Sequence, residues 1–214
     1  WIDAHTAAVR TFMEAENGAG KRGYGFRPAD RDVKAGLTNM SRRAAFHPIQ
    51  QYLDFCAVNH GPETLQAAKS RVESLWIDYM GSPDDSYHRD TALKFMVACV
   101  ARAFEPGHKF DYSPILHGAQ GVGKSTFVAI LAQHWYGELS ADFSNPQKLV
   151  EQMQGCWIME LPELSSITRG QIEDVKAFIS GTAIKARLAY NARAESYLRQ
   201  TCFIGSTNDA EFLI

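Results

Sequence analysis

The stretch SPILHGAQGVGKSTF, residues 113–127, decides the fold of this chain. Residues 118–125 match the pattern G-x-x-x-x-G-K-[ST] at every fixed position, with an apolar segment on either side. Glycines allow the backbone to curl so that successive N–H groups face phosphate oxygens, and the start of the following helix favours an anion. We therefore predict a nucleotide-binding loop that comprises Gly118, Ala119, Gln120, Gly121, Val122, Gly123, Lys124, Ser125 and Thr126.

Two side chains of this loop are expected to act on the nucleotide directly. Lys124 should reach the β and γ phosphates of ATP and take part in catalysis, and Ser125 should offer its hydroxyl to Mg²⁺. The alternative is a glycine turn that carries a lysine by chance. The apolar strand before the loop and the apolar helix after it disfavour that alternative.

A second apolar strand, residues 156–161, supplies acidic side chains. Glu160 lies near its end, and Glu163 follows after Leu161 and Pro162. One carboxylate can hold Mg²⁺ while the other polarises the attacking water. We assign Glu160 to the metal, together with Ser125, and Glu163 to the water. The reverse assignment stays open, as does a pair of solvated carboxylates at a strand end.

A third apolar strand, residues 201–206, leads to Asn208. Asn208 resembles the asparagine with which AAA+ ATPases sense the γ-phosphate and position water, and we expect it to act in catalysis. A turn-forming asparagine before Asp209 is the alternative. After a helix over residues 125–135, a strand over 139–143 and a helix to about residue 154 are expected between the loop and the acidic strand. This order resembles P-loop ATPases with an added central strand and disfavours a small-molecule kinase.

The remaining pattern divides the chain at about residue 105. Before it we expect only helices, and after Pro106-Gly107 strands alternate with helices, which predicts a parallel sheet with helices on both faces. The predicted fold is α/β, of the AAA+-like P-loop NTPase type, preceded by an all-helical region. We expect domains at 1–105 and 106–214, the second incomplete at its C-terminus. The expected helices cover residues 1–16, 29–44, 48–59, 63–80 and 87–104.

Basic residues gather between the acidic strand and the third strand. They are Lys185, Arg187, Arg193 and Arg199, with Tyr190 and Tyr197 among them, in a region expected to form a hairpin over 183–190 and 195–199. Cationic and aromatic side chains of this kind can bind a nucleic-acid backbone. One arginine could instead complete the ATP site of a neighbouring subunit as an arginine finger. A solvated charged hairpin is the plainer alternative.

Composition limits the remaining possibilities. The 214 residues carry a net charge of -2, so any nucleic-acid contact must come from a local patch. The four cysteines are far apart in sequence and lack a CxxC pair, which indicates free thiols in a reducing compartment. No segment reaches the ~18 apolar residues of a membrane helix, and no signal peptide is recognisable. We expect a cytoplasmic protein without a membrane partner and, because the chain opens at Trp1, a piece of a longer protein.

Several phrases of the sequence carry a family resemblance: Phe46-His47-Pro48, WIDYMG (76–81), the run 89–112, HGAQGVGKST (117–126), GCWIMELPEL (155–164), VKAFISG (175–181) and FIGSTNDAEFL (203–213). Together they resemble the virulence-associated protein E family, primase-helicase-like ATPases of phages and mobile elements that are similar to superfamily 3 AAA+ helicases. The resemblance covers about residues 46–214.

This resemblance implies the ATP-hydrolysing motor domain of a replication helicase that acts on DNA in a bacterial cell. It also implies single-stranded DNA, a primase domain or protein, and a homo-oligomeric ring such as a hexamer as partners. An ATP-gated regulatory switch that binds partners without translocation is the alternative.

Overall fold

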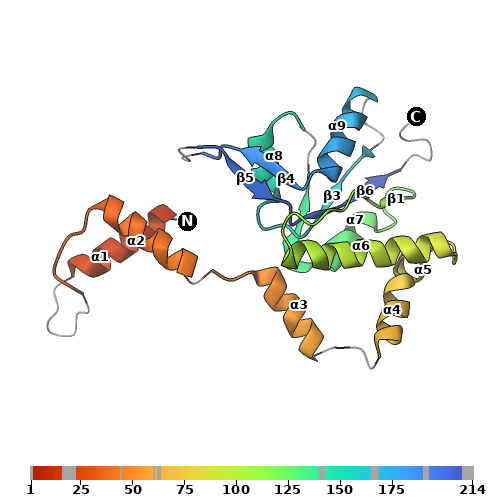
Figure 1. Cartoon of the computed structure of the whole chain (residues 1–214), viewed down its shortest axis with the longest axis horizontal. Helices are drawn as coiled ribbons and strands as arrows, with labels where there is room; N and C mark the ends of the chain where they lie inside the picture. The colour runs from red at the N-terminus through yellow and green to blue at the C-terminus, as the bar shows by residue number, and fades with distance from the viewer. Residues whose placement is uncertain are drawn as a thin grey trace. The chain divides into compact units, whose positions relative to one another are not determined.

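The computed structural model describes residues 2–15, 23–43, 45–59, 61, 64–139, 143–164, 169–189 and 193–208 (Figure 1). Contacts divide the chain into two compact units, Trp1–Pro48 and Ile49–Ile214. Residue 105, where we expected a domain boundary, is where the secondary structure changes from helical to α/β. The helices between residue 49 and that point belong to the same compact unit as the sheet.

The first unit contains two helices, α1 (Ile2–Glu14) and α2 (Asp30–Arg43). Arg10 forms ion pairs with Glu14 on its own helix and with Asp30 at the start of α2. Val33 on α2 is buried. The expected N-terminal helical region is therefore present.

The helical part of the second unit begins with α3 (Pro48–Asn59), α4 (Leu65–Glu73), α5 (Leu75–Met80) and α6 (Ser86–Phe104). The single helix expected over 63–80 is wrong in its middle, because the backbone leaves the helical region at Ser74 (φ -85°, ψ 0°). Side chains of Thr64 and Asp85 cap α4 and α6 by accepting backbone N–H bonds.

The central sheet is parallel, with strand order β1-β6-β3-β2. Its strands are β1 (Ile115–His117), β2 (Tyr136–Glu138), β3 (Ile158–Leu161) and β6 (Cys202–Thr207). The third apolar strand, β6, lies between the strand that precedes the glycine loop and the acidic strand. The strand expected between the loop and the acidic strand in sequence corresponds to β2, which lies at the edge of the sheet and not at its centre. All four strands end at the same edge of the sheet, which brings the residues after them together.

Both faces of the sheet are covered by helices, so the predicted architecture is confirmed (Figure 1). Ile158 and Ile204 share a buried cluster with residues of α6 and of α7 (Lys124–Ala132). Met159 and Phe203, one position along each strand, share a second cluster with α8 (Pro146–Met153) and α9 (Arg169–Ser180). This alternation is the pattern of strands buried on both faces.

The strand expected at 139–143 lies earlier in the chain. The first helix after the loop ends at Gln133, whose φ of 55° stops it, and a short 3-10 helix η1 (Gln133–Trp135) leads into β2. The strand is therefore formed by Tyr136–Glu138, and residues 140–142 lie outside the described part.

The expected hairpin is present as an antiparallel pair, β4 (Ala183–Ala186) and β5 (Glu195–Leu198). It forms a separate two-stranded sheet that leads through residues 199–201 into β6. Tyr190 lies outside the described residues. Of the helices that the structure describes, none is long and apolar enough to cross a membrane.

Candidate functional site

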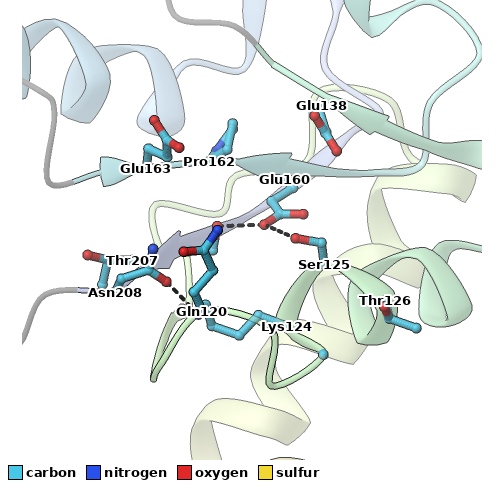
Figure 2. Close-up of a pocket in the computed structure, with 13 residues that line it drawn as sticks. Gln120, Lys124, Ser125, Thr126, Glu138, Glu160, Pro162, Glu163, Thr207 and Asn208 are labelled. Carbon is cyan, nitrogen blue, oxygen red and sulfur yellow. Dashed lines mark hydrogen bonds between the residues drawn. The ribbon is translucent and has the colours of Figure 1, made fainter.

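A cavity of ≈ 380 Å³ opens where the glycine loop meets the ends of β2, β3 and β6 (Figure 2). It brings together most of the expected loop with the expected acidic and asparagine residues, whereas Gly118, Ala119 and Val122 are not part of its lining. It also contains residues that sequence reasoning missed. Its lining is Gln120, Gly121, Gly123, Lys124, Ser125, Thr126, Glu138, Glu160, Pro162, Glu163, Ser206, Thr207 and Asn208.

The loop between β1 and α7 depends on the backbone freedom of glycine. Gly121 and Gly123 have φ of +82° and +93°, a left-handed region that other residues rarely adopt. A Cβ added at either position would have no atom within 4 Å, so there is room for a side chain. Glycine is therefore favoured at these positions by the backbone conformation and not by a lack of space. Among the described residues, no backbone hydrogen bond uses the N–H groups of residues 119–123. These donors face no competing acceptor from the backbone and can bind an anion.

Lys124 lies at the base of the cavity with only 8% of its surface exposed. Its ammonium donates to the carbonyl oxygens of Gly118 at 2.6 Å and Ala119 at 3.0 Å. It also donates to Oδ1 of Asn208 at 2.8 Å, from the end of β6 (Figure 2). An ammonium has three donors, so the lysine is fully satisfied by the loop and by the asparagine.

Glu160 is almost completely buried, with 1% of its surface exposed. Its Oε1 accepts hydrogen bonds from Oγ of Ser125, at 2.9 Å, and from Oγ of Ser206. Its Oε2 accepts from Oη of Tyr136 at 2.8 Å. A buried carboxylate is stable only when such donors replace water. Three hydroxyls from three different elements provide that replacement.

Tyr136 and Glu138 extend this network along β2. The Tyr136 hydroxyl lies 2.9 Å from Oε1 of Glu138 as well as next to Glu160. Burial raises the pKa of the Tyr136 hydroxyl, and its hydrogen bonds to Glu160 and Glu138 raise it further. Sequence reasoning missed both residues because it placed the strand three residues too late. An acidic residue at the end of a correctly placed strand is the signal that would have found Glu138.

Ser125 and Glu160 fit the magnesium role expected for them. Both offer hard oxygen atoms, which Mg²⁺ prefers, at the edge of one cavity. Within the described part of the chain, no three His, Cys, Asp or Glu side chains gather as a complete metal site. A cation here would therefore need further oxygen atoms from water and from the ligand, as is usual for Mg²⁺ bound with phosphates.

Glu163 occupies an unusual place beside the cavity. Its φ of 51° is in the left-handed region, a conformation that costs energy in a residue with a side chain. In Figure 2 its side chain points away from Ser125 and lies on the side of Asn208. Glu160 and Glu163 thus lie differently in the cavity: Glu160 contacts Ser125, whereas Glu163 lies on the side of Asn208 (Figure 2).

The four basic candidates do not form one surface. Lys185, Arg187 and Arg193 are exposed on and near the β4–β5 hairpin. Arg199 is only 2% exposed, with its guanidinium carbon 4.2 Å from the ring centre of Phe178 and 5.1 Å from that of Phe203.

In this conformation Arg199 can reach neither DNA nor a neighbouring subunit, so the expected finger or DNA role does not fit it. The reason is its position, because the chain turns inward there to enter β6. Burial, with a smaller effect of nearby Arg102, lowers the pKa of Arg199 to about 10.

The glycine loop between a parallel strand and a helix, with β6 between that strand and the acidic strand, defines an α/β domain whose parallel sheet is flanked by helices. The sequence of residues 63–214 matches the Virulence-associated protein E-like domain, and the chain belongs to this family. The resemblance seen in the sequence is therefore confirmed.

Solved structures that match the chain include the NrS-1 C-terminal region (305–718), with 17% identity and a TM-score of 0.42. That match covers 65% of this chain and 34% of the other, so the chain spans about a third of that structure. JCV helicase matches at 11% identity with a TM-score of 0.46, over 98% of this chain and 68% of the other. No curated protein matches the chain.

Proposed function

We propose that this chain is the ATP-binding and ATP-hydrolysing domain of a phage-type replication helicase or primase-helicase that acts on DNA. The observation that carries the proposal is the convergence of the glycine loop, Lys124, Ser125, Glu160 and Asn208 on one cavity. Membership of the virulence-associated protein E-like family supports the same assignment.

The residues of the cavity suit distinct parts of phosphoryl transfer to water. The loop N–H groups and Lys124 would hold the phosphates of ATP and stabilise the charge that develops on the γ-phosphate. Ser125 and Glu160 would hold Mg²⁺, which neutralises phosphate charge when it is bound. Glu163 and Asn208 also line the cavity, where they would orient the attacking water.

One component that such sites commonly use is an arginine. Among the described residues that line the cavity, none is an arginine. In comparable systems an arginine supplied in trans is worth about 10³–10⁵ in rate. We therefore propose a homo-oligomeric ring in which a neighbour supplies this charge, with Arg187 and Arg193 as candidates. Exposed Lys185 and the same two arginines are candidates for contact with single-stranded DNA. A primase domain or protein is the further partner proposed.

The test is the rate of ATP hydrolysis per subunit, measured against protein concentration with and without single-stranded DNA. The proposal expects a rate that rises as subunits assemble and rises again with DNA. A rate that is independent of concentration while the protein stays monomeric, and that DNA leaves unchanged, would reject the ring motor.

That second outcome would favour an ATP-gated switch, which one observation also supports. The bond between Lys124 and Asn208 ties the loop to the end of β6, and β6 continues back through residues 199–201 to the hairpin. A bound phosphate would compete for both side chains. ATP could therefore change the position of the hairpin for a protein partner without any translocation.

A further inference from the structure

The register of the sheet places a tyrosine and two glutamates around one point. Glu138 on β2 is the direct partner of Glu160 on β3. Tyr136 lies two residues before Glu138, so its side chain emerges on the same face of β2. Glu138 and Glu160 stand side by side at the strand ends in Figure 2. Two carboxylates in this position repel each other unless a donor lies between them, and the Tyr136 hydroxyl is that donor.

The hydroxyl has more acceptors than protons. It lies 2.8 Å from Oε2 of Glu160 and 2.9 Å from Oε1 of Glu138, both within hydrogen-bond distance. A phenol carries a single proton, so it donates to one carboxylate at a time. The two glutamates therefore compete for it. Donation to Glu160 stabilises a buried carboxylate, whereas Glu138 is exposed and can be solvated by water instead.

We propose that Tyr136 and Glu138 form an exchange pair for Glu160. Without a divalent cation the Tyr136 hydroxyl donates to Glu160. When Glu160 binds a cation, the hydroxyl donates to Glu138 instead. Glu138 is thus a positioning residue, which accepts the hydrogen bond that metal binding releases. This inference rests on the proposed function, because it assumes that Glu160 is a metal ligand.

The exchange makes predictions of opposite sign for the two residues. Tyr136→Phe removes the donor that competes with the cation for Glu160, so a cation should bind more tightly. Glu138→Leu removes the second acceptor, so the donor stays on Glu160 and the cation should bind more weakly. Glu138→Gln removes the same charge but keeps an oxygen acceptor. The difference between the Leu and Gln variants therefore isolates acceptance from simple charge attraction.

The experiment measures Mn²⁺ binding in the presence of ADP, by electron paramagnetic resonance and by calorimetry, on the whole chain. Tyr136→Phe should strengthen Mn²⁺ binding by about tenfold, since a hydrogen bond to a charged group contributes about that much. Glu138→Leu should bind Mn²⁺ about tenfold more weakly than Glu138→Gln. In chains that also carry Tyr136→Phe, the Leu and Gln variants should bind equally. Tyr112→Phe, on an exposed tyrosine outside the cavity, is the matched control and should change nothing.

Other outcomes overturn the inference. Weaker Mn²⁺ binding by Tyr136→Phe would make the tyrosine a plain support for Glu160. Equal Mn²⁺ binding by Glu138→Leu and Glu138→Gln would mean that Glu138 acts only through its charge and not as a hydrogen-bond acceptor. This comparison tests the exchange even if Tyr136→Phe folds poorly. If the unaltered chain shows no ADP-dependent Mn²⁺ binding, the proposed function falls together with the exchange. If the unaltered chain binds and the variants match it, the exchange alone falls.

Discussion

Two regions of this domain bury charged side chains, and they compensate the charges differently. In the cavity, buried Lys124 donates hydrogen bonds to two loop carbonyl groups and to Asn208. Buried Glu160 accepts hydrogen bonds from the hydroxyls of Ser125, Ser206 and Tyr136. At the base of the hairpin, buried Arg199 has one bond, from Nη2 to the carbonyl of Phe178, and otherwise lies against aromatic rings. Its Nε and Nη1 have no hydrogen-bond partner among the described residues.

The two regions differ in whether the partners of each buried charge can be replaced by a ligand. Every partner in the cavity is a hydroxyl, an amide or a loop carbonyl, which a phosphate or a cation could replace. The partners of Arg199 are ring faces, and cation–π contact keeps a guanidinium in place without offering it a new ligand. The cavity is therefore arranged for exchange of ligands, and the arginine is arranged for packing between α9 and β6.

The largest effect is expected from the variant that removes the positively charged lysine of the cavity. Lys124→Ala should abolish ATP binding or turnover while leaving the fold intact, because the lysine is satisfied only by groups that water can also bind. Nucleotide binding by calorimetry and ATP turnover are the measurements, with circular dichroism as the check on folding. Unchanged nucleotide affinity and unchanged ATP hydrolysis in this variant would contradict the assignment of the cavity as the nucleotide site.

The next effect separates the two acidic residues of the motif. Whichever glutamate orients water should, as the Gln variant, keep ATP bound and lose hydrolysis by ~10²-fold or more, as losses of a general base do. We expect that result for Glu163→Gln. Glu160→Gln should also weaken binding of Mg²⁺-ATP, because Glu160 contacts Ser125. Binding and hydrolysis are measured at varied Mg²⁺ concentration, and the opposite result would exchange the two roles.

These two predictions rest on residues that the sequence alone identified, and the reason is geometric. A fixed spacing within residues 118–125 determines the loop, and apolar strands that end in Glu160 and Asn208 must share one edge if the sheet is parallel. Glu138 and Tyr136 were missed because the helix was expected to continue to residue 135, whereas a left-handed Gln133 stops it. A positive φ is uncommon for glutamine, so the pattern of residues 125–135 does not predict that the helix stops there.

The basic residues show a second limit of sequence reasoning. Clustering between positions 185 and 199 says that charge is present but not which way each side chain points. Lys185 is exposed on β4, whereas Arg199 is enclosed by Phe178 and Phe203, one of them from a helix and the other from the next strand. The packing of α9 against β6 determines that Arg199 is buried, and the spacing of basic residues within 185–199 does not predict it.

Substitution of two buried arginines, Arg102 and Arg199, tests how buried charge is compensated at the base of the hairpin. Arg102 donates to three carbonyl groups, those of His108, Phe110 and Thr201. Arg102→Met should therefore cost about 3 kcal/mol or more in the free energy of unfolding, because it leaves buried acceptors without donors. Arg199→Met frees one carbonyl and removes an unpaired buried charge, so it should change stability by less than about 1 kcal/mol.

Urea denaturation of both arginine variants is the measurement. A loss for Arg199→Met as large as that for Arg102→Met would mean that the two aromatic rings hold the guanidinium as firmly as three carbonyl groups do.

The smallest expected effect concerns the exposed side of the hairpin. Lys185→Ala and Arg193→Ala should each weaken binding of single-stranded DNA by a few-fold and reduce its salt dependence by about one counterion per side chain. The physical reason is that each exposed cation neutralises at most one phosphate. Binding is measured by fluorescence anisotropy over a range of salt concentration. Lys94→Ala, an exposed lysine on α6 whose nearest acidic partner is 3.9 Å away, is the matched control. If the three variants show the same affinity and the same salt slope as the unaltered chain, the hairpin carries no DNA contact. The exposed charges would then be left with solvation alone, and any DNA contact of this domain would have to come from another surface.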